Sequence, residues 1–428
     1  MAEICAFPGI RYNQEKVGDL TSATCPPYDV ITPEEQKAYY QKSEYNVVRL
    51  EHGMVLPEDT ESDNKYTRAK VIFSQWLNEH IMQADPVSSF YIYEHTFSYQ
   101  NNRKRRLGLI ACLRLEPWGS KVVFPHENTA SGIKSDRLQL MQACAANFSP
   151  LLGLYEDPGQ KVTQLLNARM KRKPLIDFTD GVDIHKVWMA NEPEFVQRVS
   201  HFMAPKAIYI ADGHHRYETA LAYRDERQQI SMSSSSEEAF NFVMTTLVSF
   251  SDSGLIALPI HRLVRGLSPE ALAGLREHLE TFFEIESHPL GKVGLSEVGG
   301  ATIMVLGLEP GNAIALRLRQ SASLDEVMPV NTSGVYRKLD VSIVQHVILG
   351  KLLGFSGESD NIAYISDIEQ VRKLIDSGQY QLAFLLNSVP VTTIKAIANA
   401  NDRMPMKSTY FYPKLPTGLV AYRLEGRL

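Results

Sequence analysis

The spacing of apolar residues predicts helices in several parts of the chain. Tyr66, Ala69, Phe73, Trp76 and Leu77 fall on one helical face, so about residues 61–83 should form an amphipathic helix. Similar stripes predict further helices at 135–146, 192–203, 268–282 and 341–353, and one that contains Tyr217, Ala220 and Leu221. Apolar, β-rich runs predict strands at 46–50, 90–98, 107–115, 206–210, 301–307 and 313–318. The runs 90–98 and 107–115 lie around Gln100-Asn101-Asn102 and are expected to form a hairpin. The basic run 103–106 is expected to be its solvated shoulder, with contact to phosphate as the alternative.

This mixture of elements predicts an α/β (α+β mixed) protein. A length of 428 residues suggests two or three domains, at roughly 150 residues per domain. The pattern changes near residue 255, so we expect a core at 1–250 and an α+β region at 251–428. The tail, 404–424, is rich in aromatic residues and prolines, and we expect it to pack back onto the chain.

Composition excludes several classes of protein. The net charge of −5 argues against broad electrostatic binding to nucleic acid or to an anionic membrane. No run approaches 18 apolar residues, so no membrane span is expected. The four cysteines lie far apart without a CxxC pair, which disfavours a zinc ribbon or a disulfide framework. A cytoplasmic location fits best.

The most informative segment is Asp212-Gly213-His214-His215-Arg216, between a predicted strand and a predicted helix. Backbone N–H groups at a helix start form an anion site, and Gly213 lets the backbone approach the anion closely. His215 and Arg216 add donors suited to phosphate oxygens. Asp212, a carboxylate beside a phosphate site, indicates a metal ion or a transferred proton. A structural role for either histidine alone remains an alternative.

A second group of polar residues precedes the helix at 135–146. Glu127, next to His126, could be a general base or a metal ligand, and Lys134 and Arg137 could pair with phosphate. Asp136 and Arg137 could equally serve only as capping and salt-bridge residues. No HExxH helix is present, which excludes the usual zinc-protease arrangement.

Weaker signals lie near both ends of the chain. The segment 26–30, Pro-Pro-Tyr-Asp-Val, forms either part of a site wall or a simple turn. Lys407, with Ser408, Thr409 and Lys414, resembles part of a phosphate cradle but lacks the glycine-rich lead of a P-loop. We expect the tail to bring Lys407 or Lys414 near the anion site.

Distinctive stretches are distributed over the chain: PPYDVI (26–31), YNVVRL (45–50), PHENT with DR (125–137), NFSPLLGLY (147–155), ADGHHRYETAL (211–221), HR (261–262), LDV (339–341) and MPMKSTYFYPKLPTGLV (404–420). In this combination they resemble the family known as domain of unknown function 1015.

The turn at 212–216 also resembles the nucleotide-phosphate motif of the ParB/sulfiredoxin superfamily, whose free-serine kinases carry Asp-Gly-x-His-Arg. This resemblance implies a ParB/sulfiredoxin-like core, phosphate binding by Gly213, His215 and Arg216, and a metal or catalytic role for Asp212. It also implies that Glu127 is the catalytic base. The superfamily includes DNA-binding proteins, but the acidic balance and the lack of a basic arm disfavour DNA here.

The sequence therefore predicts a nucleotide-dependent, kinase-like phosphotransferase that acts on a small hydroxyl-bearing metabolite, such as an amino acid. ATP or ADP and Mg²⁺ are the expected cofactors, and a homodimer is compatible with the sequence. The expected catalytic residues are Glu127, His126 and Asp212, with Asp212 also the metal ligand; the expected phosphate-binding residues are Gly213, His214, His215, Arg216, Lys134, Arg137 and Lys407.

Two alternatives remain: a non-catalytic nucleotide- or metabolite-binding regulator, and a metal-dependent phosphohydrolase that uses His126, Glu127, Asp212 and His214. The kinase-like hypothesis places both motifs in one cleft, with Glu127 and His215 within roughly 10–12 Å of each other.

Overall fold

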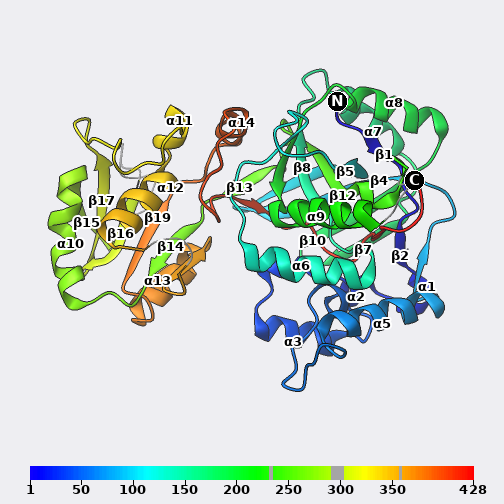
Figure 1. Ribbon diagram of the computed structural model, residues 1–428, viewed down its shortest axis with the longest axis horizontal. Helices are drawn as coiled ribbons and strands as arrows, with labels where there is room; N and C mark the ends of the chain where they lie inside the picture. Colours follow the sequence, from blue (N-terminus) through cyan, green and yellow to red (C-terminus); the bar gives the residue numbers. More distant parts are fainter. Residues whose placement is uncertain (231–234, 291–302, 356–358) are drawn as a thin grey trace. The chain divides into compact units, whose positions relative to one another are not determined.

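The computed structural model describes residues 1–230, 235–290, 303–355 and 359–428. The chain forms two compact units, shown in Figure 1. Unit 1 comprises Met1–Pro125, Thr129–Ile256 and Pro413–Leu428, and unit 2 comprises His126–Asn128 and Ala257–Tyr412. The chain therefore passes between the units four times. Each unit contains both helices and strands, which confirms the mixed α/β class.

The described residues of unit 1 contain a nine-stranded mixed sheet. Eight strands follow the order β6 (Val123–Phe124), β11 (Ile208–Asp212), β8 (Leu151–Tyr155), β12 (Phe242–Ser249), β5 (Asn102–Arg114), β4 (Phe90–Tyr99), β10 (Asp183–Ala190) and β9 (Ile176–Asp180), while β1 (Ile4–Cys5) pairs with β5. The β11–β6 and β12–β8 pairs are parallel, and the remaining pairs of this sheet are antiparallel. The expected hairpin at β4–β5 is confirmed, and Gln100 and Asn101 form its turn with positive φ angles.

Helices stack on this sheet in successive layers. Helix α9 (His214–Ile230) packs on β8 and β12, α6 (Ser131–Cys144) packs on α9, and α5 (Lys65–Asn78) packs on α6 (Figure 1). The other helices of the unit are α1 (Gln14–Val17), α2 (Leu20–Ala23), η1 (Tyr28–Val30), α3 (Pro33–Lys42), α4 (Val48–Glu51), α7 (Lys161–Arg169), α8 (Pro193–Met203) and η2 (Ala239–Asn241).

The C-terminal segment 413–428 belongs to unit 1. Its strand β21 (Tyr422–Arg423) pairs with β7 (Ala146–Asn147), and Ala421 bridges Ile10 of β2 (Ile10–Tyr12), which itself pairs with β3 (Met82–Ala84). The Tyr422 hydroxyl donates to the Ala239 carbonyl oxygen over 2.7 Å. The end of the chain is therefore built into the same core as its beginning.

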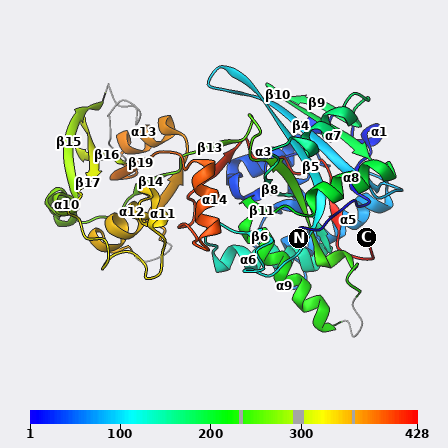
Figure 2. The ribbon, with the colours of Figure 1, turned by 90° about the horizontal axis from the view of Figure 1, so that it is seen from above.

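The described residues of unit 2 form a six-stranded antiparallel sheet, shown with its helices in Figure 2. Its order is β15 (Phe283–Pro289), β17 (Asn312–Leu318), β16 (Ile303–Glu309), β19 (Leu382–Leu386), β14 (His261–Val264) and β18 (Ile362–Ile365). The helices are α10 (Pro269–Phe282), α11 (Gly334–Arg337), α12 (Asp340–Ile343), the π-helix η4 (Val344–Leu352), α13 (Ile368–Asp376) and α14 (Val391–Asn399); β13 (Ile256–Leu258) pairs with β20 (Tyr410–Tyr412). One apolar cluster joins β14, β16, β17 and β19 to α13.

One local prediction was wrong, and another was right with narrower bounds. Residues 46–50 do not form a strand, because the Asn46 side chain accepts a hydrogen bond from the Val48 N–H and donates to the Ser22 and Thr24 carbonyls. These contacts of the Asn46 side chain with nearby backbone turn the chain, and the short helix α4 follows. The amphipathic helix expected at 61–83 is shorter, because it begins after the Asn64 cap and ends at Asn78.

No helix among the described residues combines the length and the apolar character needed to cross a membrane.

Candidate functional site

The turn between β11 and α9 depends on a glycine. Gly213 has a φ of +93°, a conformation that side chains disfavour. A Cβ atom there would also lie only 2.7 Å from Cδ2 of Leu151 and 3.0 Å from Nη2 of Arg216. Gly213 therefore allows the sheet, the start of α9 and the Arg216 side chain to meet closely.

Asp212 holds two cationic side chains beside this turn. Nη2 of Arg216 lies 2.6 Å from Oδ2 of Asp212, and Lys414 forms an ion pair with Oδ1. Burial alone would raise the pKa of Asp212, but Lys414 and Arg216 outweigh it and lower that pKa well below its usual range. Asp212 is therefore negatively charged at neutral pH. Arg216 also donates to the Pro150 carbonyl oxygen over 2.6 Å, which fixes its guanidinium.

The segment 26–30 contributes to the wall of this site. Helix η1 places Oδ2 of Asp29 3.7 Å from Nζ of Lys414. Oδ1 of Asp29 is buried and has no hydrogen-bond partner among the residues that the structure describes. Asp29 and Asp212 thus both offer carboxylate oxygens close to Nζ of Lys414. Carboxylate oxygen is the donor type that Mg²⁺ prefers.

A buried glutamate, Glu51, lies beside Arg137 and close enough to Arg216 to feel its charge. The guanidinium of Arg137 donates to the Glu51 carbonyl oxygen over 2.7 Å and lies 3.7 Å from its Oε1. Ser149 donates to Oε1 over 2.8 Å. Glu51 is only 3% exposed, and burial raises its pKa above the ordinary value despite the opposing effect of Arg137 and Arg216.

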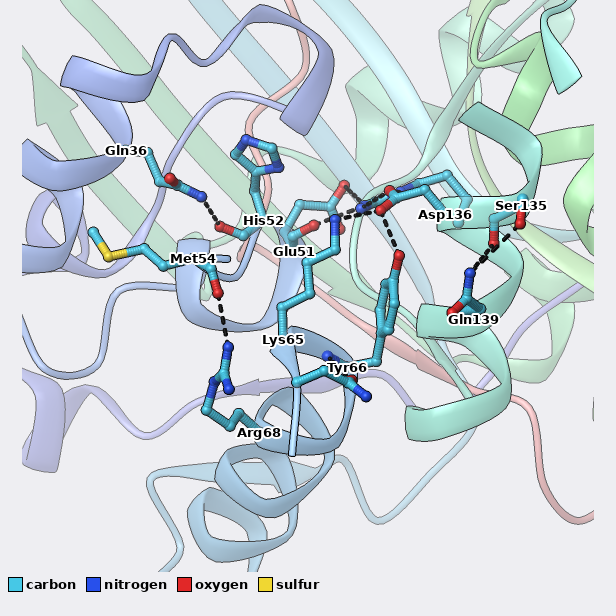
Figure 3. A network of polar contacts seen from close by, with 12 residues as sticks. Gln36, Glu51, His52, Met54, Lys65, Tyr66, Arg68, Ser135, Asp136 and Gln139 are labelled. Carbon is cyan, nitrogen blue, oxygen red and sulfur yellow. Dashed lines mark hydrogen bonds and ion pairs between the residues drawn. The ribbon is translucent and has the colours of Figure 1, made fainter. Parts of the chain in front are cut away.

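Arg137 is held in place by Asp136, which accepts a hydrogen bond from its guanidinium over 2.5 Å. Asp136 also accepts a hydrogen bond from the Tyr66 hydroxyl over 2.8 Å and pairs with Lys65, as Figure 3 shows. The guanidinium of Arg137 also covers the Tyr28 ring at 4.1 Å. Arg137 therefore combines the salt-bridge role that the sequence allowed with a position in the wall of the candidate site.

Glu51, Arg137 and Arg216 line one cavity of about 40 Å³. The remaining lining comes from two polar residues and six apolar ones: Asn147, Ser149, Leu140, Met141, Ala146, Phe148, Leu151 and Val243. This volume holds about three water molecules. The cavity can accept a small polar group, whereas a whole nucleoside is far too large for it.

Lys134 and His215 have other partners in the structure. Nζ of Lys134 lies 3.1 Å from Oε2 of Glu218, which also accepts from the Thr129 hydroxyl. Nε2 of His215 accepts a hydrogen bond from the Ala130 N–H over 2.8 Å. These contacts join the start of α6 to α9. Phosphate binding by Lys134 or His215 stays a prediction. It would require Lys134 to leave Glu218, or His215 to give up its hydrogen bond with the Ala130 N–H.

Glu127 lies in unit 2 with residues 404–409. Its two carboxylate oxygens accept hydrogen bonds from the N–H groups of Lys407 (2.8 Å), Ser408 (3.1 Å) and Thr409 (3.3 Å). Nε2 of His126 lies 3.0 Å from the Thr409 hydroxyl. These contacts hold residues 126–128 against the segment 404–409. The turn at 212–216 belongs to unit 1, so the single cleft that would contain both motifs stays a prediction.

Sequence reasoning did not identify Glu51, which directly follows the apolar run YNVVRL. A glutamate at the end of an apolar run becomes buried when the run packs in the core. The position of Glu51 beside this run was therefore the signal for it in the sequence.

The family model described as "Protein of unknown function (DUF1015)" matches residues 4–342. The chain belongs to this family. The matched range contains the turn at 212–216, Asp29, Glu51 and Glu127, whereas Lys414 lies beyond its end. No curated protein matches this DUF1015 chain.

Several solved structures resemble the DUF1015 chain at a distance. A conserved hypothetical protein from Pyrococcus furiosus has 12% identity and a TM-score of 0.37 over 71% of this chain and 92% of its own. A free serine kinase in complex with AMP has 11% identity and a TM-score of 0.39 over 71% of this chain and 88% of its own. SbnI with a C-terminal truncation from Staphylococcus aureus has 9% identity and a TM-score of 0.32 over 74% and 87%. These scores are too low to support an argument about fold or function, and the ParB/sulfiredoxin-like core stays a prediction.

Proposed function

We propose that this DUF1015 protein is a nucleotide-dependent phosphotransferase that acts on a small hydroxyl-bearing metabolite, such as an amino acid. The proposal rests on one observation: Arg216 and Lys414 both form ion pairs with Asp212 at the start of α9. Two cations beside a helix N-terminus favour phosphate binding, and Gly213 lets a phosphate approach the backbone. In this proposal Gly213 to Arg216 and Lys414 bind the phosphates of ATP or ADP.

Asp212 and Asp29 are the proposed magnesium ligands. Both carboxylates contact Lys414, and the buried Oδ1 of Asp29 has no hydrogen-bond partner in the described part of the chain. Bound magnesium would neutralise phosphate charge. While no phosphate is bound, Asp212 keeps Lys414 and Arg216 positioned and compensates their charge.

Glu51 is the proposed general base, in place of Glu127. A carboxylate with a raised pKa is a better proton acceptor, and Glu51 shares a cavity with Arg216 of the turn. Both oxygens of Glu127, in contrast, already accept backbone hydrogen bonds. The cavity volume suits the small polar group of an amino acid or hydroxy acid.

The proposed reaction is a single displacement at phosphorus. The hydroxyl oxygen of the metabolite attacks the terminal phosphorus of the nucleotide, and the bond from that phosphorus to the bridging oxygen breaks. The hydroxyl proton passes to the carboxylate of Glu51. The products are a phosphorylated metabolite and a nucleotide shortened by one phosphate.

A thermal-shift panel followed by a turnover assay tests this function. ATP, ADP, CTP and GTP are added with and without magnesium, because a ligand that binds the native state raises its melting temperature. We expect a shift with ATP or ADP and a phosphorylated product from a panel of amino acids and hydroxy acids. No shift with any nucleotide contradicts the proposal, and a shift without turnover supports a binding regulator instead. A cytoplasmic location and a homodimer stay predictions.

A further inference from the structure

A second group of polar side chains lies on strands β4 and β10 of unit 1. His95 on β4 is directly opposite His185 on β10, and Asp183 begins β10 two residues earlier. Residues two apart on a strand point to the same face of the sheet. One ligand atom from each of His95, Asp183 and His185 lies within 4.8 Å of those of the other two.

The surrounding structure holds these side chains in place. Nε2 of His95 lies 2.9 Å from Oδ2 of Asp183, and the rings of His95 and His185 lie 4.3 Å apart. Phe178 stacks on the ring of His185 at 4.9 Å. The two histidines are 1% and 5% exposed, whereas the Asp183 side chain is 26% exposed. The group is therefore buried among aromatic rings and reaches solvent at Asp183.

A second contact orients His185 as a metal-binding histidine. The Tyr93 hydroxyl lies 2.8 Å from Nδ1 of His185. When Nδ1 carries the proton and donates to this hydroxyl, the lone pair of Nε2 is available to a cation. Such an outer partner is typical of histidines that bind metals.

The positive charge of Arg106 disfavours cation binding by His95, Asp183 and His185. Nη2 of Arg106 lies 3.5 Å from Nδ1 of His95 and donates to the Pro413 carbonyl oxygen over 2.8 Å. The contact with His95 is at the upper limit of a hydrogen bond, so it constrains that ring only weakly. The guanidinium charge nevertheless weakens cation binding, so the affinity should be lower than that of a structural zinc site.

We propose that His95, Asp183 and His185 bind a first-row transition-metal ion, with Zn²⁺ as the best match. Two neutral imidazoles and one carboxylate form a known zinc ligand set, and a water molecule completes the coordination where Asp183 meets solvent. Mg²⁺ and Ca²⁺ prefer all-oxygen sites, so neither should compete. This proposal rests on other residues than those of the proposed nucleotide site.

The test is a zinc titration by calorimetry of the full-length protein after treatment with a chelator. We expect a single zinc site whose affinity falls more than about 100-fold in His185→Gln and in Asp183→Asn, and about 10- to 100-fold in Tyr93→Phe. Cobalt should give the absorption spectrum of a site with nitrogen ligands. His201→Gln, which changes an exposed histidine, should bind zinc like the natural chain.

Circular dichroism melting curves show whether each variant still folds, which separates loss of the site from loss of the fold. If His185→Gln fails to fold, Asp183→Asn still tests the zinc site. The proposal is overturned if the natural chain binds no zinc, or if the folded ligand variants bind zinc as tightly as the natural chain. Neither outcome affects the proposed phosphotransferase.

Discussion

Asp212 and Lys414 form an ion pair across a sequence separation of 202 positions. The pair joins the turn between β11 and α9 to the C-terminal segment of unit 1. The two side chains are only 17% and 10% exposed, so each charge depends on the other for compensation. The middle of the chain and its C-terminal segment must therefore both be in place before the candidate phosphate site exists.

Asp212→Asn should destabilise the fold at neutral pH by about 3 kcal/mol, because it leaves Lys414 and Arg216 without their shared counter-charge. Urea denaturation measures this change in the free energy of unfolding. Asp225→Asn is the matched control, since Asp225 forms a surface pair with Arg224 and should change the stability by less than about 0.5 kcal/mol.

The effect of Asp212 should also depend on pH. Its pKa is lower in the folded state, so its contribution is present above the ordinary carboxyl pKa of about 3.9 and is lost as the pH falls through the folded-state value. The gap in stability between the natural chain and Asp212→Asn should therefore shrink below about pH 4. A gap that stays constant down to the acid transition would show that Asp212 does not act through its charge.

Gly213→Ala should lose both stability and nucleotide binding. The positive φ costs about 1 kcal/mol for a residue with a side chain, and the close contact with Leu151 adds to it. Gly181→Ala is the control, because Gly181 has a φ of +60° and no atom within 4 Å of an added Cβ. Both variants should show the cost of a side chain at positive φ in denaturation. Only Gly213→Ala should also lose nucleotide binding in a titration, because only there would a side chain block the approach of phosphate to the backbone. Equal losses in the two variants would argue against a special role for Gly213.

Glu51→Gln should reduce turnover by about 100-fold or more and leave nucleotide affinity nearly unchanged, because it removes only the proton acceptor. The raised pKa of Glu51 should also set the acid limb of the rate profile above the ordinary glutamate pKa of about 4.3. Steady-state kinetics across pH measure both effects. Glu127→Gln is the comparison, and a large loss in this variant with none in Glu51→Gln would restore Glu127 as the base.

Removal of residues 413–428 should give insoluble or strongly destabilised protein. The deletion exposes the partners of β21 and removes Lys414 from Asp212. Removal of only residues 427–428 is the control and should change the melting temperature little, because Arg427 is exposed. A chain lacking 413–428 that melts like the natural one would contradict the docking of this segment.

The sequence predicted features that depend on local physics. The amphipathic helices, the β4–β5 hairpin and the strand–glycine–helix turn at 212–216 all follow from residue spacing and from the conformational freedom of glycine. The mixed α/β class follows from the same patterns.

Long-range pairing could not be predicted in the same way. Glu51 meets Arg137 and Lys414 meets Asp212 only through the tertiary fold. The basic run 103–106 was expected to be a solvated hairpin shoulder, yet Arg106 is 1% exposed, because β5 lies between β12 and β4 and is buried from Arg106 to Leu113. Spacing along the chain carries no signal for such partners.

Calorimetric titration of the full-length protein with ATP and ADP in the presence of magnesium tests the central claim most directly. We expect saturable binding of at least one nucleotide by the natural chain and a loss of about 10-fold or more in Arg216→Ala, because a charge-assisted contact to phosphate disappears. Arg227→Ala, an exposed arginine on the same helix α9, should bind like the natural chain. Absence of binding by the natural chain, or unchanged binding by a folded Arg216→Ala variant, would contradict the account.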